Sequence, residues 1–320
     1  RPENGIAFFD GLTIETDKIT DPRQDRVLPI LEEEQVYMCR RMRHLFEEQT
    51  APLVLDVGTG SGVFAIWAAK HGARVVAVDI SERALRFARK NVRENAKTTV
   101  REAKSSSALN LASPDEMSEA EDLIPGEILL ANCRFGADFL SRFEENVGVQ
   151  LSSFDVVTLS PPYNPTAPFV EPAEHAAADL DGQKCFEEQI KAVPNVLSEK
   201  GVCVGNQMTP ARSKDDLYAI KQIKEVFGDS WSIKYDHILG DLYGGKDENE
   251  IRDFLKTQYK TYRSDRPGES NYTIEQGKGY DVDGYIEDTE EEIRRKMSAQ
   301  ETAPLYWALI YYEVRWSDNQ

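Results

Sequence analysis

The sequence predicts an α/β fold, with a doubly wound and mostly parallel sheet that helices cover on both faces. The first observation is an alternation of segments: a strand over 53–58, a helix over 62–71, a strand over 74–80 and a helix from about 82 to 95. Strands that alternate with helices form parallel sheets, because a crossover helix must return the chain to the same edge. The second observation is a glycine-rich turn that directly follows the first strand.

The alternation continues through the second half of the chain. These later segments are short apolar runs separated by amphipathic stretches, which is the pattern of buried strands and their covering helices. We expect strands over 127–133, 154–159, 201–207, 231–239 and 305–316, and helices over 183–197 and 213–227. A further helix over 32–48 precedes the first strand of the core.

Two polar stretches interrupt this core. Residues 97–126 and 240–302 have little periodic apolar content, which favours insertions over core elements. Within the second stretch, Thr289 to Ser298 should be helical. The domains that follow are an N-terminal flap and helix over 1–50, a core over 51–239 and 303–320 with the inserted loop 97–126, and an inserted cap over 240–302.

The charge balance argues against a polyanionic partner. The chain has 56 acidic and 38 basic residues and a formal net charge of −18, whereas nucleic-acid binding depends on Lys and Arg that displace condensed counterions. Two basic clusters, at 40–44 and 83–93, are typical of solvated helix faces. We therefore expect a small-molecule or peptide substrate rather than a nucleic acid. The sequence leaves the oligomeric state open.

Cysteine spacing and hydropathy give no sign of a disulfide framework, a metal site or a membrane segment. The four cysteines form no CxxC pair, which fits the cytoplasm and no bound metal. No apolar stretch approaches the ~20 residues that cross a bilayer. The chain begins at Arg1 instead of Met, so the possibility of a removed leader stays open.

The glycine-rich turn predicts a cofactor site at the carboxyl end of the first strand. Its pattern, DxGxGxG, starts at Asp56 and continues through Gly58, Thr59 and Gly60 to Gly62. Side chains at the glycine positions would obstruct a ligand that approaches the backbone N–H groups and the start of the next helix. The turn by itself does not say which cofactor binds.

Two acidic residues narrow the choice of cofactor. Asp79 ends the second strand about 20 positions after Gly58, where a carboxylate can accept both hydroxyls of a ribose. A dinucleotide fingerprint would place its third glycine at Val63, and this chain has it at Gly62, which disfavours NAD. Asp56 is placed to meet an ammonium group. A ribose-binding acid and an ammonium-binding acid together suit S-adenosylmethionine.

At these positions the chain resembles class I S-adenosylmethionine-dependent methyltransferases. The resemblance covers about residues 53–239 and 305–316, and it implies a Rossmann-like sheet of seven strands with a C-terminal antiparallel hairpin. It also implies that Asp138, in an Ala-Asp pair with Ala137, contacts the adenine amino group, and that Ile80 packs on the adenine face. A helix N-cap is the alternative role for Asp138.

The tetrapeptide Ser160-Pro161-Pro162-Tyr163 predicts a methyl-acceptor site. Consecutive prolines fix an extended backbone and leave carbonyl oxygens without neighbouring N–H groups. A nitrogen that donates to the Pro161 carbonyl and the Ser160 hydroxyl would be held in place, while Tyr163 stacks on the planar group. An ordinary proline-rich loop is the alternative. Ligands of open α/β sheets, however, bind at the carboxyl ends of strands, where this turn lies.

The tetrapeptide is similar to the (Asn/Asp/Ser)-Pro-Pro-(Tyr/Phe) motif of amino methyltransferases, and most similar to the release-factor glutamine methyltransferase group. Stretches 9–12, 27–29, 171–172 and 178–182 support this resemblance. That group has Asn where this chain has Ser160, and commonly Arg where it has Ile30. Because Ser160 offers one hydroxyl instead of an amide pair, the resemblance does not carry the glutamine substrate over to this chain.

Three functions are compatible with these features. The first is N-methylation of an amine or amide nitrogen in a small molecule or peptide, by direct in-line transfer from S-adenosylmethionine, with the N-terminal flap and the cap closing over the substrate. The second is methylation of adenine or cytosine in nucleic acid, or of a protein glutamine. The third is non-catalytic binding of S-adenosylmethionine by an interaction protein. Charge favours the first over nucleic acid, and the acceptor motif stands against the third.

Overall fold

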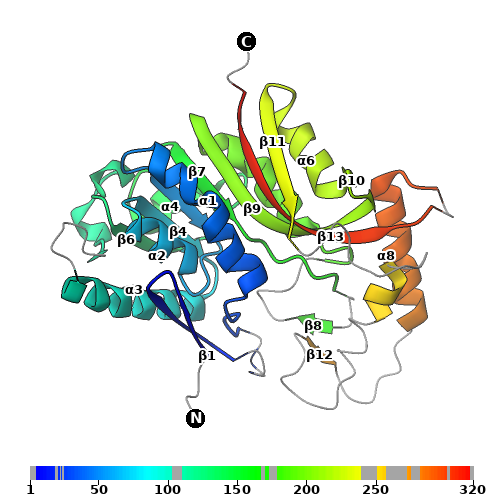
Figure 1. The fold of residues 1–320 in the computed structure, drawn as a ribbon, viewed down its shortest axis with the longest axis horizontal. Helices are drawn as coiled ribbons and strands as arrows, with labels where there is room; N and C mark the ends of the chain where they lie inside the picture. The colour runs from blue at the N-terminus through cyan, green and yellow to red at the C-terminus, as the bar shows by residue number, and fades with distance from the viewer. Residues whose placement is uncertain are drawn as a thin grey trace.

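A sheet with helices on both faces runs through the molecule (Figure 1). The computed structural model describes residues 5–18, 21, 23, 25–102, 110–166, 170–172, 179–238, 251–256, 272–274, 282–300 and 303–317. The strands lie in the order β11-β13-β9-β7-β3-β4-β6-β5. The predicted α/β fold with a mostly parallel sheet is confirmed.

The sheet is parallel from β5 to β9 and antiparallel at its other edge. The strands are β3 (Leu53–Val57), β4 (Arg74–Asp79), β5 (Asn110–Leu111), β6 (Glu127–Asn132), β7 (Phe154–Leu159), β9 (Leu197–Ser213), β11 (Trp231–His237) and β13 (Tyr306–Trp316). The short β10 (Asp216–Leu217) pairs with the end of β9. Since β13 pairs antiparallel with both β9 and β11, the C-terminal antiparallel pair is also as predicted.

Helices cover the two faces because alternate strand residues face opposite sides. Val54 and Val75 pack in the cluster that contains α1 (Tyr37–Glu48) and α2 (Val63–Lys70), next to α3 (Glu82–Glu102). Leu55 and Val76 pack in the cluster on the other face. That cluster contains α4 (Phe139–Val147), α5 (Lys184–Ala192) and α6 (Tyr218–Phe227). No helix in the described ranges is long and apolar enough to cross a membrane.

Two elements are longer than the sequence pattern suggested. α3 continues to Glu102, and β5 then joins the sheet edge beside β6, so the stretch 97–126 is not a loop throughout. The reason for the longer helix is the lack of any Gly or Pro between residues 82 and 113. β9 continues to Ser213 instead of ending near 207, because its extension pairs with β13. Two 3-10 turns, Pro114–Glu116 and Ala120–Asp122, also lie in this part of the chain.

Parts of the stretch 240–302 pack against the antiparallel edge of the sheet. α8 (Val282–Met297) corresponds to the helix predicted over 289–298, but it begins seven residues earlier and ends one residue earlier. Residues 251–256 are helical, and β12 (Tyr272–Ile274) pairs with β8 (Val170–Pro172). Side chains of 251–256 and α8 share one apolar cluster with Trp307 of β13. The rest of the predicted cap lies outside the described residues.

The N-terminal segment is tied to α3. β1 (Gly5–Phe9) and β2 (Leu12–Thr16) form a hairpin, and the side-chain oxygen of Asn91 accepts a hydrogen bond from the Glu15 N–H at 2.9 Å. Asp17 is fully buried and accepts hydrogen bonds from Arg83 Nε at 2.9 Å and from the Val27 N–H at 2.8 Å. These contacts hold Val27 near the first turn of α3.

We expect Asp17→Ala to lower the free energy of unfolding by about 3 kcal/mol, because it leaves the Arg83 guanidinium and the Val27 N–H without their shared partner. Urea unfolding followed by circular dichroism measures the loss. Glu32→Ala is the control, since it removes an exposed ion pair with Arg40 and should change stability by less than about 1 kcal/mol. Equal losses in both variants would contradict the structural role of Asp17.

Candidate cofactor and acceptor site

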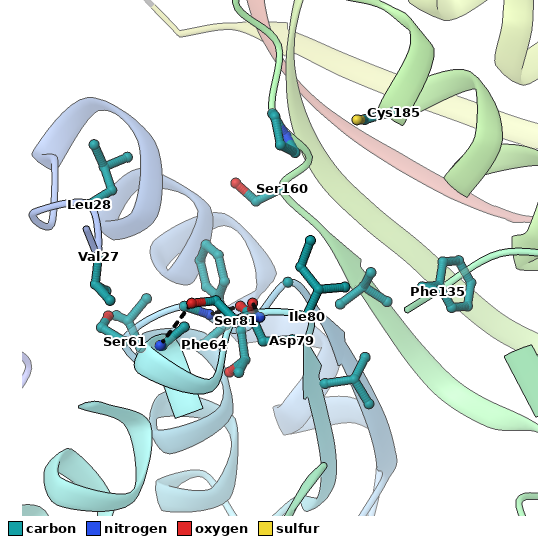
Figure 2. A pocket seen from close by; sticks show the side chains of 18 of the residues that line it. Val27, Leu28, Ser61, Phe64, Asp79, Ile80, Ser81, Phe135, Ser160 and Cys185 are labelled. Atoms are coloured by element: carbon teal, nitrogen blue, oxygen red, sulfur yellow. Dashed lines mark hydrogen bonds between the residues drawn. The ribbon is translucent and has the colours of Figure 1, made fainter. Parts of the chain in front are cut away.

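A cavity of about 400 Å³ lies where the strand order reverses (Figure 2). β3 has β4 on one side and β7 on the other, so their carboxyl ends open a crevice between the two halves of the sheet. Ligands of doubly wound sheets bind in such crevices. The lining comes from the glycine turn, the ends of β3 and β4, the starts of α2 and α3, the loop after β6, the turn after β7, α5 and the N-terminal segment. Its residues are 57–61, 63–64, 78–81, Ala84, 133–135, Ser160, Pro162, 185, 188–189, 25–28, Ile30 and Gln35.

The glycine turn has the backbone that its sequence requires. Gly58, Gly60 and Gly62 have φ of +68°, +56° and +84°, in the left-handed region that favours glycine. A Cβ on Gly58 would meet nothing within 4 Å, whereas a Cβ on Gly62 would lie 3.1 Å from the Cβ of Ala88. Gly58, Thr59 and Gly60 therefore leave room for a ligand, and Gly62 allows α2 and α3 to approach closely.

Asp79 joins the end of β4 to the glycine turn. Its Oδ2 accepts a hydrogen bond from the Gly60 N–H at 2.8 Å, and its Oδ1 accepts one from the Ser81 N–H at 2.8 Å. Burial raises the pKa of this carboxyl despite these bonds. Ile80 follows with 60% of its surface exposed, and both residues line the cavity. The Asp79 carboxylate, which can accept hydrogen bonds from hydroxyl groups, is therefore next to the apolar side chain of Ile80, on which a planar ring can pack.

Asp56 lies beneath the turn. It is 1% exposed, and its two carboxylate oxygens accept hydrogen bonds from Thr59 Oγ1 at 2.7 Å and Thr158 Oγ1 at 2.6 Å. Burial raises the pKa of this carboxyl as well. Asp56 is absent from the cavity lining. Its contacts hold Thr59 in place, and its predicted contact with an ammonium group stays a prediction.

The loop after β6 contains the residues that were predicted to contact adenine. Ala137 and Asp138 are exposed and do not line the cavity. Asp138 forms an ion pair with Arg142 and makes no side-chain hydrogen bond that caps α4, so the capping role is absent and the adenine contact stays a prediction. Phe135, from the same loop, lines the cavity instead and is 5% exposed. An aromatic residue just after a buried strand is the sequence signal that could have identified it.

The tetrapeptide, hereafter the acceptor turn (Ser160–Tyr163), contributes two of its four residues to the cavity. Ser160 and Pro162 line it, and Pro161 is buried behind them. Tyr163 is half-buried and does not line the cavity; its hydroxyl donates to Glu34 Oε1 at 2.5 Å. Its ring packs at the edge of the apolar cluster that contains Trp307. The predicted stacking position of Tyr163 is therefore not part of the cavity lining.

The N-terminal segment forms a wall that the sequence pattern did not single out as cofactor-binding. Figure 2 shows Val27 and Leu28 on one side of the cavity, with Phe135 and Cys185 on the other. Gln35 also lines the cavity and accepts a hydrogen bond from the Leu31 N–H at 2.8 Å. In the sequence, Val27 and Leu28 are two adjacent apolar residues in a polar stretch, which is a weak signal of a binding site. Only the fold brings them to the crevice.

We expect Gly62→Ala to destabilise the fold more than Gly58→Ala. Both substitutions place a side chain at positive φ, at about 1–2 kcal/mol each. Only the first also pushes a methyl group against Ala88, which adds about 1–3 kcal/mol of overpacking. Thermal unfolding of the two variants tests the ranking, and a Gly58→Ala variant that melts at the lower temperature would contradict it.

Comparison with known proteins gives matches to methyltransferases. Residues 36–150, which contain the glycine turn, Asp79 and the loop after β6, match the family model of ribosomal protein L11 methyltransferase (PrmA). A ribosomal protein L11 methyltransferase of Thermotoga maritima is 60% identical over 43 residues, 13% of this chain and 16% of that protein. A release factor glutamine methyltransferase of Chlorobaculum tepidum is 29% identical over 209 residues, 62% of this chain and 58% of that protein.

The chain thus spans no more than 58% of the length of these curated relatives. The solved structure of a SAM-dependent methyltransferase from Agrobacterium tumefaciens covers 74% of this chain and 63% of its own, with 16% identity and a TM-score of 0.48. The matches include both the ribosomal-protein family and the release-factor group, so the subgroup is not resolved. The matches are to methyltransferases, so the core resembles the class I methyltransferases, which use S-adenosylmethionine.

Proposed function

We propose that this protein transfers a methyl group from S-adenosylmethionine to an amine or amide nitrogen of a small molecule or peptide. The observation that carries the proposal is that two groups of residues line the same cavity from neighbouring strand ends. One group is Asp79 with the glycine turn, and the other is Ser160 with Pro162. A site for the cofactor and a polar turn for an acceptor are both needed for direct transfer, and here they adjoin.

The residues around the cavity fit the cofactor. Gly58 and Gly60 leave open space above the turn, Asp79 offers a carboxylate for the ribose hydroxyls, and Ile80 and Phe135 offer apolar surface for adenine. Bound S-adenosylmethionine would supply a methyl group on a positively charged sulfur. The role of Asp56 in this proposal is to hold Thr59, which lines the cavity.

The acceptor turn would hold the nitrogen. The Ser160 hydroxyl is a hydrogen-bonding group on the cavity wall. The Pro161 carbonyl behind it has no competing N–H beside it, because residue 162 is also a proline. Two such contacts orient the lone pair of the nitrogen, so that binding rather than acid–base chemistry supplies most of the rate. The printed names of both curated relatives refer to protein substrates, which supports a peptide over other acceptors.

Nucleic acid is the second candidate acceptor. Four cations of α3 gather around a shallow hollow, at Arg86, Arg89, Lys90 and Arg93, and Ala84, one half-turn earlier, lines the cavity. Against it stands the net charge of −18, which repels a phosphate backbone. One of the four, Lys90, is already paired with Glu15 at 2.5 Å. We therefore favour the peptide or small molecule.

The substrate class is tested with methyl-labelled S-adenosylmethionine and fractions of a cell extract. Each fraction is treated with nuclease, treated with protease or passed through a small-molecule filter. We expect the labelled product to survive nuclease treatment. We also expect it either to be degraded by protease or to pass through the small-molecule filter. Label that only nuclease removes would overturn the choice of acceptor, and no label in any fraction would overturn the enzyme activity.

Cofactor binding and methyl transfer should separate by mutation. We expect Asp79→Asn to weaken binding of S-adenosylhomocysteine by about tenfold or more, because an amide cannot accept hydrogen bonds at both positions. Calorimetric titration measures the dissociation constant. Asp138→Ala is the control and should leave it unchanged, because that residue is exposed away from the cavity. Weaker binding of S-adenosylhomocysteine by the Asp138→Ala variant would instead support the adenine contact that the resemblance implied.

Tyr163→Ala should abolish methyl transfer while binding of S-adenosylhomocysteine stays within about twofold of the wild type, since Tyr163 belongs to the acceptor turn and not to the cofactor residues. The measurement is a paired assay of label transfer and calorimetric binding on one preparation. Full turnover in this variant would show that the acceptor turn is wrongly assigned.

A further inference from the structure

Glu34 is a buried carboxyl group that no cation of the described residues compensates. The buried carboxyl side chains in the described part of the chain are those of Asp17, Glu34, Asp56, Asp181 and Glu313. Lys or Arg side chains form ion pairs with three of them, and Asp56 accepts two threonine hydroxyls. Glu34, which is 7% exposed, has the single hydroxyl of Tyr163. A buried carboxylate so poorly compensated is costly, and such groups concentrate at functional sites.

Glu34 lies directly behind the acceptor side of the cavity. It belongs to a π-helical turn over Glu32–Val36, a conformation that is rare and frequent at functional sites. The next residue, Gln35, lines the cavity, as does Pro162, which precedes Tyr163. The hydrogen bond from Tyr163 to Glu34 therefore spans the wall between the N-terminal segment and the acceptor turn. It uses one lone pair of Oε1, and a carboxylate has about four.

Asn206 adds a second unused polar group beside the acceptor turn. It is fully buried, and neither its side-chain nitrogen nor its oxygen has a hydrogen-bond partner among the described residues. Gly205 of β9 pairs with Leu159 of β7, so Asn206 is level with Ser160. A buried amide without partners costs about 1–3 kcal/mol per group and calls for an explanation.

Asn206 lies on the same face of the sheet as Glu34. Across the sheet it pairs with Tyr311, and directly opposed residues point to one face. The Tyr311 ring contacts Tyr37, with ring centroids 6.3 Å apart, and Tyr37 follows Glu34 by three residues. A carboxyl group that binds Tyr163 and an amide level with Ser160 thus lie behind the acceptor turn, on two different elements and just outside the cavity lining.

We propose that Glu34 and Asn206 form the subsite for the methyl-accepting nitrogen, and that the acceptor is an aliphatic amine that arrives as an ammonium ion. The inference rests on the proposed function and specifies its substrate class. A cation compensates the buried carboxylate, and the Asn206 oxygen accepts a further N–H. A neutral amide brings no charge, so it would leave the burial of Glu34 unbalanced.

The proton balance follows from the same contact. The ammonium group gives one proton to the Glu34 carboxylate, which leaves a neutral amine with a free lone pair. The nitrogen then forms a bond to the methyl carbon as the carbon–sulfur bond breaks and its electron pair returns to sulfur, so the products are a methylated ammonium ion and a neutral thioether. Burial raises the pKa of Glu34, which makes its carboxylate a better proton acceptor than an exposed one.

The test uses the full chain, methyl-labelled S-adenosylmethionine and the extract fraction that the wild type labels. Glu34→Gln keeps the size and an oxygen that can accept from Tyr163, and removes the charge. We expect its kcat/KM for the acceptor to fall at least about 30-fold, with S-adenosylhomocysteine bound as in the wild type, which also shows that the variant is folded. Asn206→Ala should raise KM for the acceptor, and the exposed Glu33→Gln control should stay within about twofold.

Hot-acid hydrolysis of the labelled product identifies the nitrogen. A methylated aliphatic amine keeps the label in a non-volatile basic product, whereas a methylated amide releases it as volatile methylamine. Release of methylamine, or a Glu34→Gln variant with wild-type kcat/KM, would overturn the inference and leave the proposed methyltransferase intact. A wild-type protein that labels no fraction would instead contradict the proposed function itself.

Discussion

The pairing of β3 with β4 on one side and β7 on the other is the constraint on which the site depends. Parallel strands end at the same edge of a sheet, so this pairing brings the glycine turn, Asp79 and Ser160 together although they lie far apart in the chain. The backbone bonds from Gly60 and Ser81 to the Asp79 carboxylate then fix the turn against the neighbouring strand. The cavity is what remains open between these strand ends.

The N-terminal segment completes the site through buried charge. Asp17 binds Arg83 of α3 and the backbone N–H of Val27, and these contacts hold the N-terminal segment against α3. The same segment then turns through the π-helical residues that contain Glu34. Within this segment, the buried Asp17 carboxylate is neutralised by Arg83 and stabilises the fold. The buried Glu34 carboxyl group, in contrast, has only the Tyr163 hydroxyl among the described residues, and Tyr163 belongs to the acceptor turn. This difference in compensation is the reason why we assign a structural role to Asp17 and propose a chemical role for Glu34.

Prediction from the sequence succeeded where a function needs a particular local backbone. Only glycine readily adopts the positive φ of positions 58, 60 and 62, so the turn and its place after a strand were legible from residue types. Prediction was less accurate where nothing local marks an end, as in α3, which runs on to Glu102. It was incomplete in the loop after β6, which directs the Asp138 side chain to Arg142 and presents Phe135, a residue that the pattern did not single out, to the cavity.

The sequence by itself determined the fold class, the strand ends that carry the site, and the glycine turn with Asp79, because these follow from periodicity and backbone preferences within a few residues. Only the tertiary structure decided that Asp56 lies beneath the turn, that Val27 and Leu28 form a wall, and that Tyr163 binds Glu34, 129 residues away. Such contacts join segments that nothing in the local pattern links. Their partners are chosen by packing and by the cost of burying polar groups, which are properties of the whole fold.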